Sequence, residues 1–173
     1  MSKMSVRDLS LAAILAAVYA VLTLALPIPP FHGVQLRVAE ALTVLPLIIP
    51  AATPGLVVGC MVVNLFSPFT LDILIGSFAT LLACWLTERM PNAWLAPLPP
   101  AICNAAIVGA EIAWFETGFG AGFGAAYLLN ACTVGAGELL ACYGLGLPLL
   151  KVLTGIPLLR ERIPAERLGR ITF

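Results

Sequence analysis

Long apolar runs dominate this chain, and short segments rich in proline, glycine or polar residues separate them. An α-helix needs roughly 20 apolar residues to cross the hydrocarbon core of a bilayer. Several runs reach or approach that length, and proline or glycine stands at the ends of most of them. The pattern predicts six α-helices and a charged tail. The helices are expected over residues 8–26, 35–49, 53–67, 70–86, 99–115 and 125–150, and the tail over 151–173.

The composition indicates that these helices lie in a membrane. The 173 residues are 61% hydrophobic and 10% charged, whereas soluble domains carry roughly 25% charged residues. So few charges cannot cover the surface of a soluble globule, and most of the surface must face lipid. The predicted fold is therefore an all-α membrane protein, a bundle of six transmembrane helices in a single domain over residues 1–173.

The positions of lysine and arginine predict the orientation of the bundle. Basic residues precede the first helix, follow the fourth at Arg89, and recur in the tail. With six spans, all of them fall on one side of the membrane. The loops expected on the other side, 27–34, 67–70 and 116–124, contain no lysine or arginine. Because basic residues favour the cytoplasmic side, we expect a multi-pass protein of the cell membrane with both termini cytoplasmic.

Several charged residues lie inside the predicted spans, where each costs at least about 2.5–3.5 kcal/mol. Arg37 and Glu40 are three residues apart and share a helix face. Either the two residues form a salt bridge that neutralises both charges, or the pair orients Glu40 toward a ligand. These two interpretations are compatible. Asp72, Glu111 and Glu138 are then left with no basic partner in the spans. Such carboxyl groups must be protonated, hydrated, or matched by a cationic or N–H-rich molecule from outside.

Three asparagines add carboxamides to the spans. Asn104 and Glu111 are about 20° apart around one helix, and Asn130 and Glu138 about 80° apart on another, so each pair is predicted to face inward. Asn64 lies on the third helix. The alternative for each asparagine is a hydrogen bond between helices, worth around 0.6 kcal/mol on average. Asp72 has an alternative role as a cap of the fourth helix.

The first helix carries small residues at every fourth position. Ala12, Ala16 and Ala20 form one row, and Ala13 and Ala17 form a parallel one. Small residues at this spacing let another helix approach closely. The row serves either internal packing or the docking of a separate membrane subunit.

Other features exclude several classes of function. The net charge is zero, which argues against a nucleic-acid partner. The single histidine and the absence of a CxxC pair argue against a metal site, and the five cysteines are interpreted as small buried apolar side chains. No phosphate-binding GxxxxGK[ST] loop is present, so no cofactor is expected in this chain and any ATP would be used by a partner. The sequence lacks a His–Ser or paired-Asp arrangement of the kind that an enzyme would need, so no enzyme is expected.

Specific stretches of the chain resemble the QueT family. The most specific is VQLRVAEALTVLP, residues 34–46, in the second helix. Weaker elements follow in chain order, so that the resemblance covers nearly the whole chain. They are Thr53-Pro54-Gly55-Leu56 with Gly59-Cys60 and Asn64, Asp72 with Ile75-Gly76 and residues 79–83, residues 97–100 with Asn104, and Gly137-Glu138-Leu139.

The family comprises substrate-binding S-components of energy-coupling factor (ECF) transporters. The resemblance implies uptake of queuosine precursors, which are deazaguanine-type bases. It also implies an outward-facing site roofed by loops, and as partners a transmembrane coupling protein and two ABC-type ATPases. In such S-components the alanine row of the first helix contacts the coupling protein, a role that Ala12, Ala16 and Ala20 match.

The expected site lies where the loop after the first helix meets the second helix and the later spans. Glu40 and Glu138 are expected to accept from the N–H groups of the base, and Asp72 or Glu111 to meet a cationic arm. Loops 27–34 and 67–70, with Phe31 and His32, are expected to form a lid. The predicted substrate-binding residues are Gln35, Arg37, Glu40, Asn64, Asp72, Asn104, Glu111, Asn130 and Glu138.

The residues themselves indicate only a cationic or donor-rich ligand. Thiamine would fit nearly as well as a deazaguanine, whereas the carboxylates of biotin or folate would be repelled. Only the resemblance selects the deazaguanine. A stand-alone carrier coupled to protons, with Glu111 and Glu138 as relay groups, is the alternative from another functional class.

Overall fold

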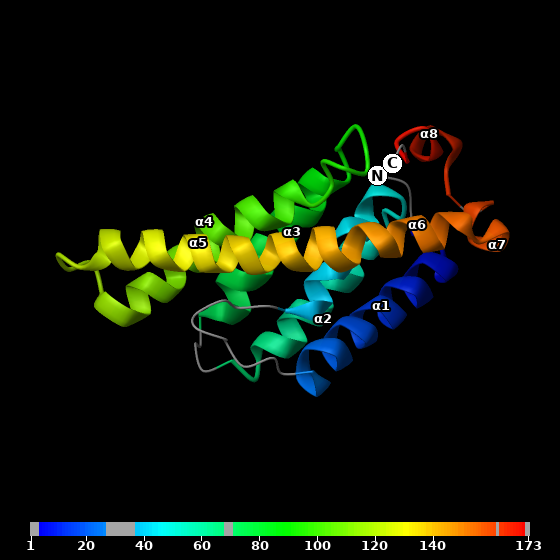
Figure 1. The fold of residues 1–173 in the computed structure, drawn as a ribbon. Helices are drawn as coiled ribbons and strands as arrows, with labels where there is room; N and C mark the ends of the chain where they lie inside the picture. The colour runs from blue at the N-terminus through cyan, green and yellow to red at the C-terminus, as the bar shows by residue number, and fades with distance from the viewer. Residues whose placement is uncertain (1–3, 27–36, 68–70, 162, 172–173) are drawn as a thin grey trace.

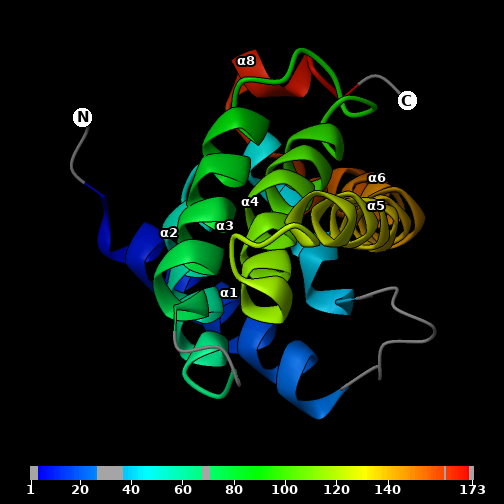
Figure 2. The same cartoon turned by 90° about the vertical axis from the view of Figure 1, so that its left-hand side faces the viewer.

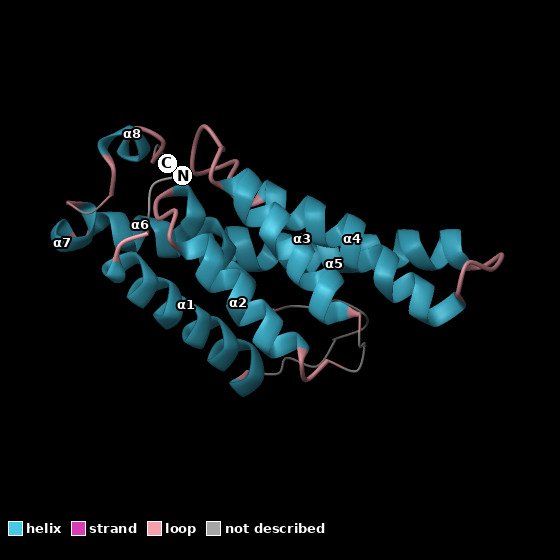
Figure 3. Cartoon of the chain, turned by 180° about the vertical axis from the view of Figure 1, so that it is seen from behind, coloured by secondary structure: helices cyan, strands magenta, loops and turns pink. Residues whose placement is uncertain are grey.

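The computed structural model describes residues 4–26, 37–67, 71–161 and 163–171, and every regular element within these ranges is helical (Figures 1 and 3). The predicted all-helical fold is confirmed. The elements are α1 (Val6–Ala25), η1 (Val38–Leu47), α2 (Ala52–Asn64), α3 (Asp72–Thr87), α4 (Leu98–Thr117), α5 (Phe123–Ala141), η2 (Cys142–Gly146), α6 (Leu147–Gly155), α7 (Pro157–Arg160) and α8 (Ala165–Leu168).

Two elements differ from the predicted α-helices. The segment predicted as an α-helix over 35–49 contains a 3₁₀ helix, η1. Pro46 cannot donate to an α-helical partner, and its ring would clash with the carbonyl one turn earlier. The helix predicted over 125–150 runs from Phe123 to Gly155 and passes through one π-helical turn, η2. Turns of this kind occur frequently at functional sites.

Three helices of the described chain are long and apolar enough to cross a membrane: α1, α4 and the continuous helix Phe123–Gly155. Three further apolar helices, η1, α2 and α3, are shorter. At about 2.0 Å per residue, the ten residues of η1 extend about 20 Å, less than the roughly 30 Å hydrocarbon core. The predicted count of six spans and the orientation of the termini therefore stay predictions.

The short helix η1 lies at the centre of the bundle. Residues 39–47 are all buried. The helix contacts α1, α2, α3 and α5 as well as η2 and α6, and the end-on view in Figure 2 shows the longer helices arranged around it. Burial on all sides, rather than local propensity, therefore accounts for its position. Its two polar side chains, Glu40 and Thr43, are held inside the bundle with it.

Helix α1 packs directly on α2 through its alanine row. A Cβ atom placed on Gly59 would lie 2.8 Å from the carbonyl oxygen of Ala16, and one on Gly55 would overlap the carbonyl oxygen of Ala12. Ala12 and Ala16 therefore take part in internal packing, one of the two alternatives for this row, and Ala20 packs against the core of the bundle. Docking of a separate subunit on this row stays a prediction. The parallel row, Ala13 and Ala17, is exposed.

The tail, which includes α8, folds back on the bundle and contacts the end of η1. The Arg167 guanidinium donates to the carbonyl oxygens of Pro46 (2.6 Å) and Leu47 (3.1 Å), and lies 4.0 Å from the Glu88 carboxylate. Arg170 donates to the carbonyl oxygen of Glu88 at 2.8 Å. Carbonyls at the end of a helix lack partners within the helix, and Arg167 supplies donors for those of η1.

Candidate functional site

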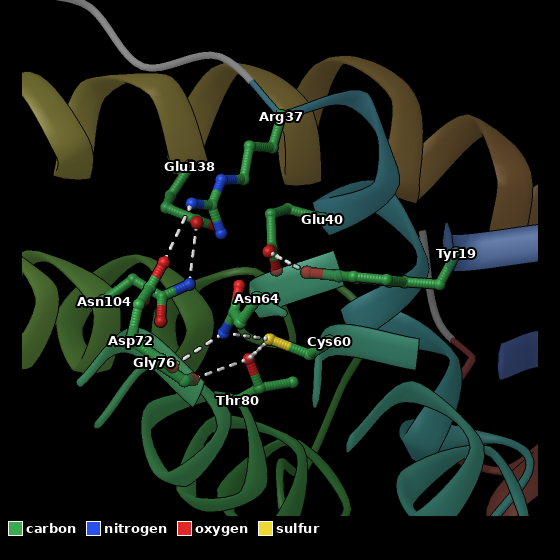
Figure 4. Close-up of polar contacts among 10 residues, drawn as sticks. All are labelled: Tyr19, Arg37, Glu40, Cys60, Asn64, Asp72, Gly76, Thr80, Asn104 and Glu138. Atoms are coloured by element: carbon green, nitrogen blue, oxygen red, sulfur yellow. Dashed lines mark hydrogen bonds and ion pairs between the residues drawn. The ribbon is translucent and has the colours of Figure 1, made fainter. Parts of the chain in front are cut away.

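A polar cavity lies between η1, α3, α4 and α5. It is a small cavity of about 20 Å³ that is partly open to solvent. Two valines give it apolar walls. The remaining lining residues are charged, carry a carboxamide, or are Gly76 and Thr80 (Figure 4). The residues that line it are Arg37, Glu40, Gly76, Thr80, Asn104, Val108, Val134 and Glu138.

Arg37 pairs with Asp72, with 3.8 Å between guanidinium nitrogen and carboxylate oxygen. This corrects two expectations, that Arg37 pairs with Glu40 and that Asp72 has no basic partner. Arg37 precedes η1 in extended backbone (φ −104°, ψ 109°), so the two residues do not share a helix face. The expectation that Asp72 caps its helix is also wrong, because Leu71 occupies that position. Asp72 lies in the first turn of α3, where the helix dipole favours a negative charge.

Glu40 is held by a side chain that the sequence analysis missed. The hydroxyl of Tyr19, which is fully buried, donates a hydrogen bond to Glu40 Oε1 (Figure 4). The second carboxylate oxygen of Glu40 is buried and has no hydrogen-bond partner in the described part of the chain. The spacing of Ala12, Ala16 and Tyr19 was the available signal, because it places all three on one helix face.

Asn104 and Glu138 face each other across the α4–α5 interface. The Asn104 carboxamide nitrogen donates to Glu138 Oε1 at 2.6 Å. The thiol of Cys142, at the start of η2, lies 3.9 Å from Glu138 Oε2 and 3.3 Å from the carbonyl oxygen of Glu40. The π-helical turn therefore begins where the long helix passes the two glutamates of the cavity.

Asn64 lies behind the cavity and forms a bond between helices. Its carboxamide nitrogen donates to the carbonyl oxygen of Asp72 at 2.8 Å. A Cβ atom on Gly76 would lie 2.9 Å from this nitrogen and overlap the Asp72 carboxylate. Because residue 76 is a glycine, the side chains of Asp72 and Asn64 can lie directly against it, next to the cavity.

The remaining predicted site residues lie outside the cavity or outside the described chain. Glu111 is buried, and interacts electrostatically with Asp72 and Arg37 without lining the cavity. Asn130 instead donates to Glu116 at 2.8 Å. Asn130 and Glu138 are eight residues apart, which is about 12 Å along the α-helix, so they lie at different levels of the bundle although they were predicted to share an inward face. Gln35, the predicted lid 27–34 with Phe31 and His32, and residues 68–70 of the second lid loop lie outside the described residues.

The site has more hydrogen-bond acceptors than donors. Arg37 faces four acidic side chains in or beside the cavity: Glu40, Asp72, Glu111 and Glu138. Within the described ranges, several buried oxygens find no donor. They are Glu40 Oε2, Asn64 Oδ1, Asp72 Oδ1, Ser77 Oγ and both carboxylate oxygens of Glu111. Glu40 lines the cavity, and Asp72 Oδ1 lies beside its lining residue Gly76. Because unpaired buried acceptors are costly, the cavity is suited to a solute rich in N–H donors. The described residues contain no cluster of His, Cys, Asp and Glu that could hold a metal ion.

The described chain has three apolar helices long enough to span a bilayer, and two of them, α4 and Phe123–Gly155, contribute residues to the polar cavity. These features are typical of a membrane protein with a site for a small polar solute. Comparison with known families agrees with this class. The model of the QueT transporter family matches residues 9–155, and the chain belongs to the QueT transporter family. This is a family of transporters, not of enzymes, and the resemblance noted in the sequence is confirmed. Searches of curated proteins and of solved structures found no match.

Proposed function

We propose that the chain is the substrate-binding S-component of an ECF-type importer, and that it captures a queuosine precursor, a deazaguanine-type base, from outside the cell. The observation that carries this proposal is the unpaired buried acceptor Glu40 Oε2 in the cavity lining, together with Asp72 Oδ1, which lies beside the lining residue Gly76. A deazaguanine presents two adjacent N–H groups on one edge, and carboxylates accept such pairs well.

Each wall of the cavity has a role in this proposal. Glu40 and Glu138 accept from the N–H edge of the base, and Arg37 donates to its carbonyl oxygen. Val108 and Val134 contact the flat faces of the ring, as apolar side chains do in most small-molecule sites. Asp72, with Glu111 nearby, receives a cationic arm where the precursor has one. Such a ligand would supply the donors that the protein lacks.

The proposed topology has six spans with both termini in the cytoplasm. The three candidate spans and the three shorter apolar helices support it, as does the one-sided distribution of lysine and arginine along the sequence. A transmembrane coupling protein and two ABC ATPases complete the importer, and ATP is used by those subunits. The coupling protein would dock on the exposed face of α1 that includes Ala13 and Ala17.

Equilibrium binding to the purified full-length chain tests the substrate. The probes are 7-aminomethyl-7-deazaguanine, thiamine and biotin. The proposal predicts saturable binding of the deazaguanine, weaker binding of thiamine and none of biotin. Tighter binding of thiamine would favour an S-component for another cationic vitamin. Binding of none of the three, or uptake by vesicles that contain this chain without ATPases, would contradict the proposal.

A further inference from the structure

Tyr19 connects an otherwise superficial helix to the cavity. The buried residues of α1 are Ala12 and Tyr19, while the remainder of the helix is half-buried or exposed. The phenol extends from α1 to η1, and its hydroxyl meets the Glu40 carboxylate (Figure 4). A buried tyrosine hydroxyl usually has a partner. Here that partner is a carboxylate that lines the cavity.

The close contact between α1 and α2 fixes the point at which this phenol enters the bundle. A Cβ atom on Gly59 would lie 3.0 Å from the Cβ atom of Tyr19 and 2.8 Å from the carbonyl oxygen of Ala16. Because residue 59 is a glycine, α1 and α2 can pack closely. A larger residue at this position would push the two helices apart. The position of Tyr19 depends on this separation.

The side chain and the backbone of Glu40 are held by different groups. Thr43 Oγ1 and Cys142 Sγ both donate to the backbone carbonyl oxygen of Glu40, at 2.6 and 3.3 Å. Tyr19 donates to Oε1 of the side chain. Oε2 has no donor among the described residues. Tyr19 thus occupies one carboxylate oxygen and leaves the other for a ligand.

We propose that Tyr19 is a positioning residue that determines specificity: it orients Glu40 so that Oε2 accepts from the exocyclic amino group of the bound base. The inference rests on the proposed function and adds to it a residue that touches Glu40 rather than the ligand. Because Tyr19 belongs to α1, base recognition also depends on how α1 packs on α2. A solute without that amino group gains nothing from the orientation of Glu40.

The test compares two ligands in two hydroxyl-deletion variants of the full-length chain. The probes are 7-aminomethyl-7-deazaguanine and its analogue without the 2-amino group. Tyr19→Phe keeps the ring and removes the donor. Tyr143→Phe is the matched control, because its hydroxyl donates to the carbonyl oxygen of Trp94 at 2.8 Å, outside the cavity. Tyr19→Phe should raise Kd for the parent base about tenfold, the effect of one hydrogen bond to a charged group, and leave Kd for the analogue nearly unchanged. Tyr143→Phe should change neither.

A loss of affinity that is equal for both ligands, or no loss for either, would overturn the role of Tyr19 and leave the proposed function standing. A wild-type protein that binds neither probe would contradict the proposed function itself. A second variant guards against a folding defect: Tyr19→Phe combined with Glu40→Gln should bind the parent base no more weakly than Glu40→Gln alone. Additive losses would show that Tyr19 acts independently of Glu40, and would overturn the inference.

Discussion

Asn104 on α4 and Glu138 on α5 form a direct hydrogen bond of 2.6 Å at the wall of the cavity. The bond joins two helices that pack along much of their length. It satisfies one oxygen of Glu138 and uses one carboxamide proton of Asn104. The bond holds the Glu138 side chain at the cavity wall, where in the proposed function it also accepts from the solute.

Replacing the carboxylate by its isosteric amide separates these two roles. In Glu138→Gln the side-chain carbonyl can still accept from Asn104, so the fold should be kept. Affinity for 7-aminomethyl-7-deazaguanine should fall about 10- to 100-fold, because hydrogen bonds to charged groups contribute about 1.5–3 kcal/mol. Glu138→Ala should abolish binding. Glu116→Gln, at an exposed glutamate bonded to Asn130, is the control, and unchanged affinity in Glu138→Gln would remove Glu138 from the site.

The contact between α1 and α2 predicts a severe effect of a small substitution. Gly55→Ala places a methyl group against the backbone of Ala12, and should destabilise the protein by about 1–3 kcal/mol through overpacking. Gly144→Ala is the control, because nothing lies within 4 Å of a Cβ atom there. Thermal unfolding in detergent measures both. Equal midpoints would show that α1 is not seated on α2 as described.

The sequence predicts the helices well because their apolar runs are long and bounded by proline, glycine or polar residues. It does not predict the 3₁₀ geometry of η1. An α-helix there would put Arg37 and Glu40 on one face, but Arg37 precedes the helix and reaches Asp72 instead. Which of two neighbouring alanine rows faces α2 also depends on the glycines opposite. No local pattern encodes that choice.

The site was predictable only where polar residues stand out against an apolar background. Glu40, Asn104 and Glu138 do so, and all three line the cavity. Tyr19 does not, because an isolated tyrosine in an apolar helix resembles ordinary packing. Asn130 stood out equally but bonds Glu116, so polarity alone does not identify members of the site.

The tail is predicted to stabilise the end of η1. Arg167→Ala removes donors to the carbonyl oxygens of Pro46 and Leu47 and the ion pair with Glu88. Hydrogen exchange at residues 163–171 should accelerate about tenfold or more, since a lost hydrogen bond to a charged group costs about 1.5–3 kcal/mol. Arg160→Ala, at an exposed arginine, should leave exchange unchanged. Similar exchange in both variants would show that Arg167 does not hold the tail.

The two alanine rows of α1 predict opposite outcomes for a bulky residue. Ala17→Trp places the indole on the exposed face, and should leave ligand binding intact while the coupling protein is lost from pull-downs. Ala16→Trp faces Gly59 and should impair folding itself. Full recovery of the coupling protein with Ala17→Trp would place the docking surface elsewhere.

The central claim is that a solute supplies the hydrogen-bond donors that the buried acceptors lack. The most direct measurement is the affinity of the wild-type chain for 7-deazaguanine and for its N1-methyl derivative, which has lost one donor of the recognised edge. We predict at least about 100-fold weaker binding of the methylated base, because a buried carboxylate oxygen is left unpaired and the methyl group meets it directly. Equal affinity for the two bases would contradict the account.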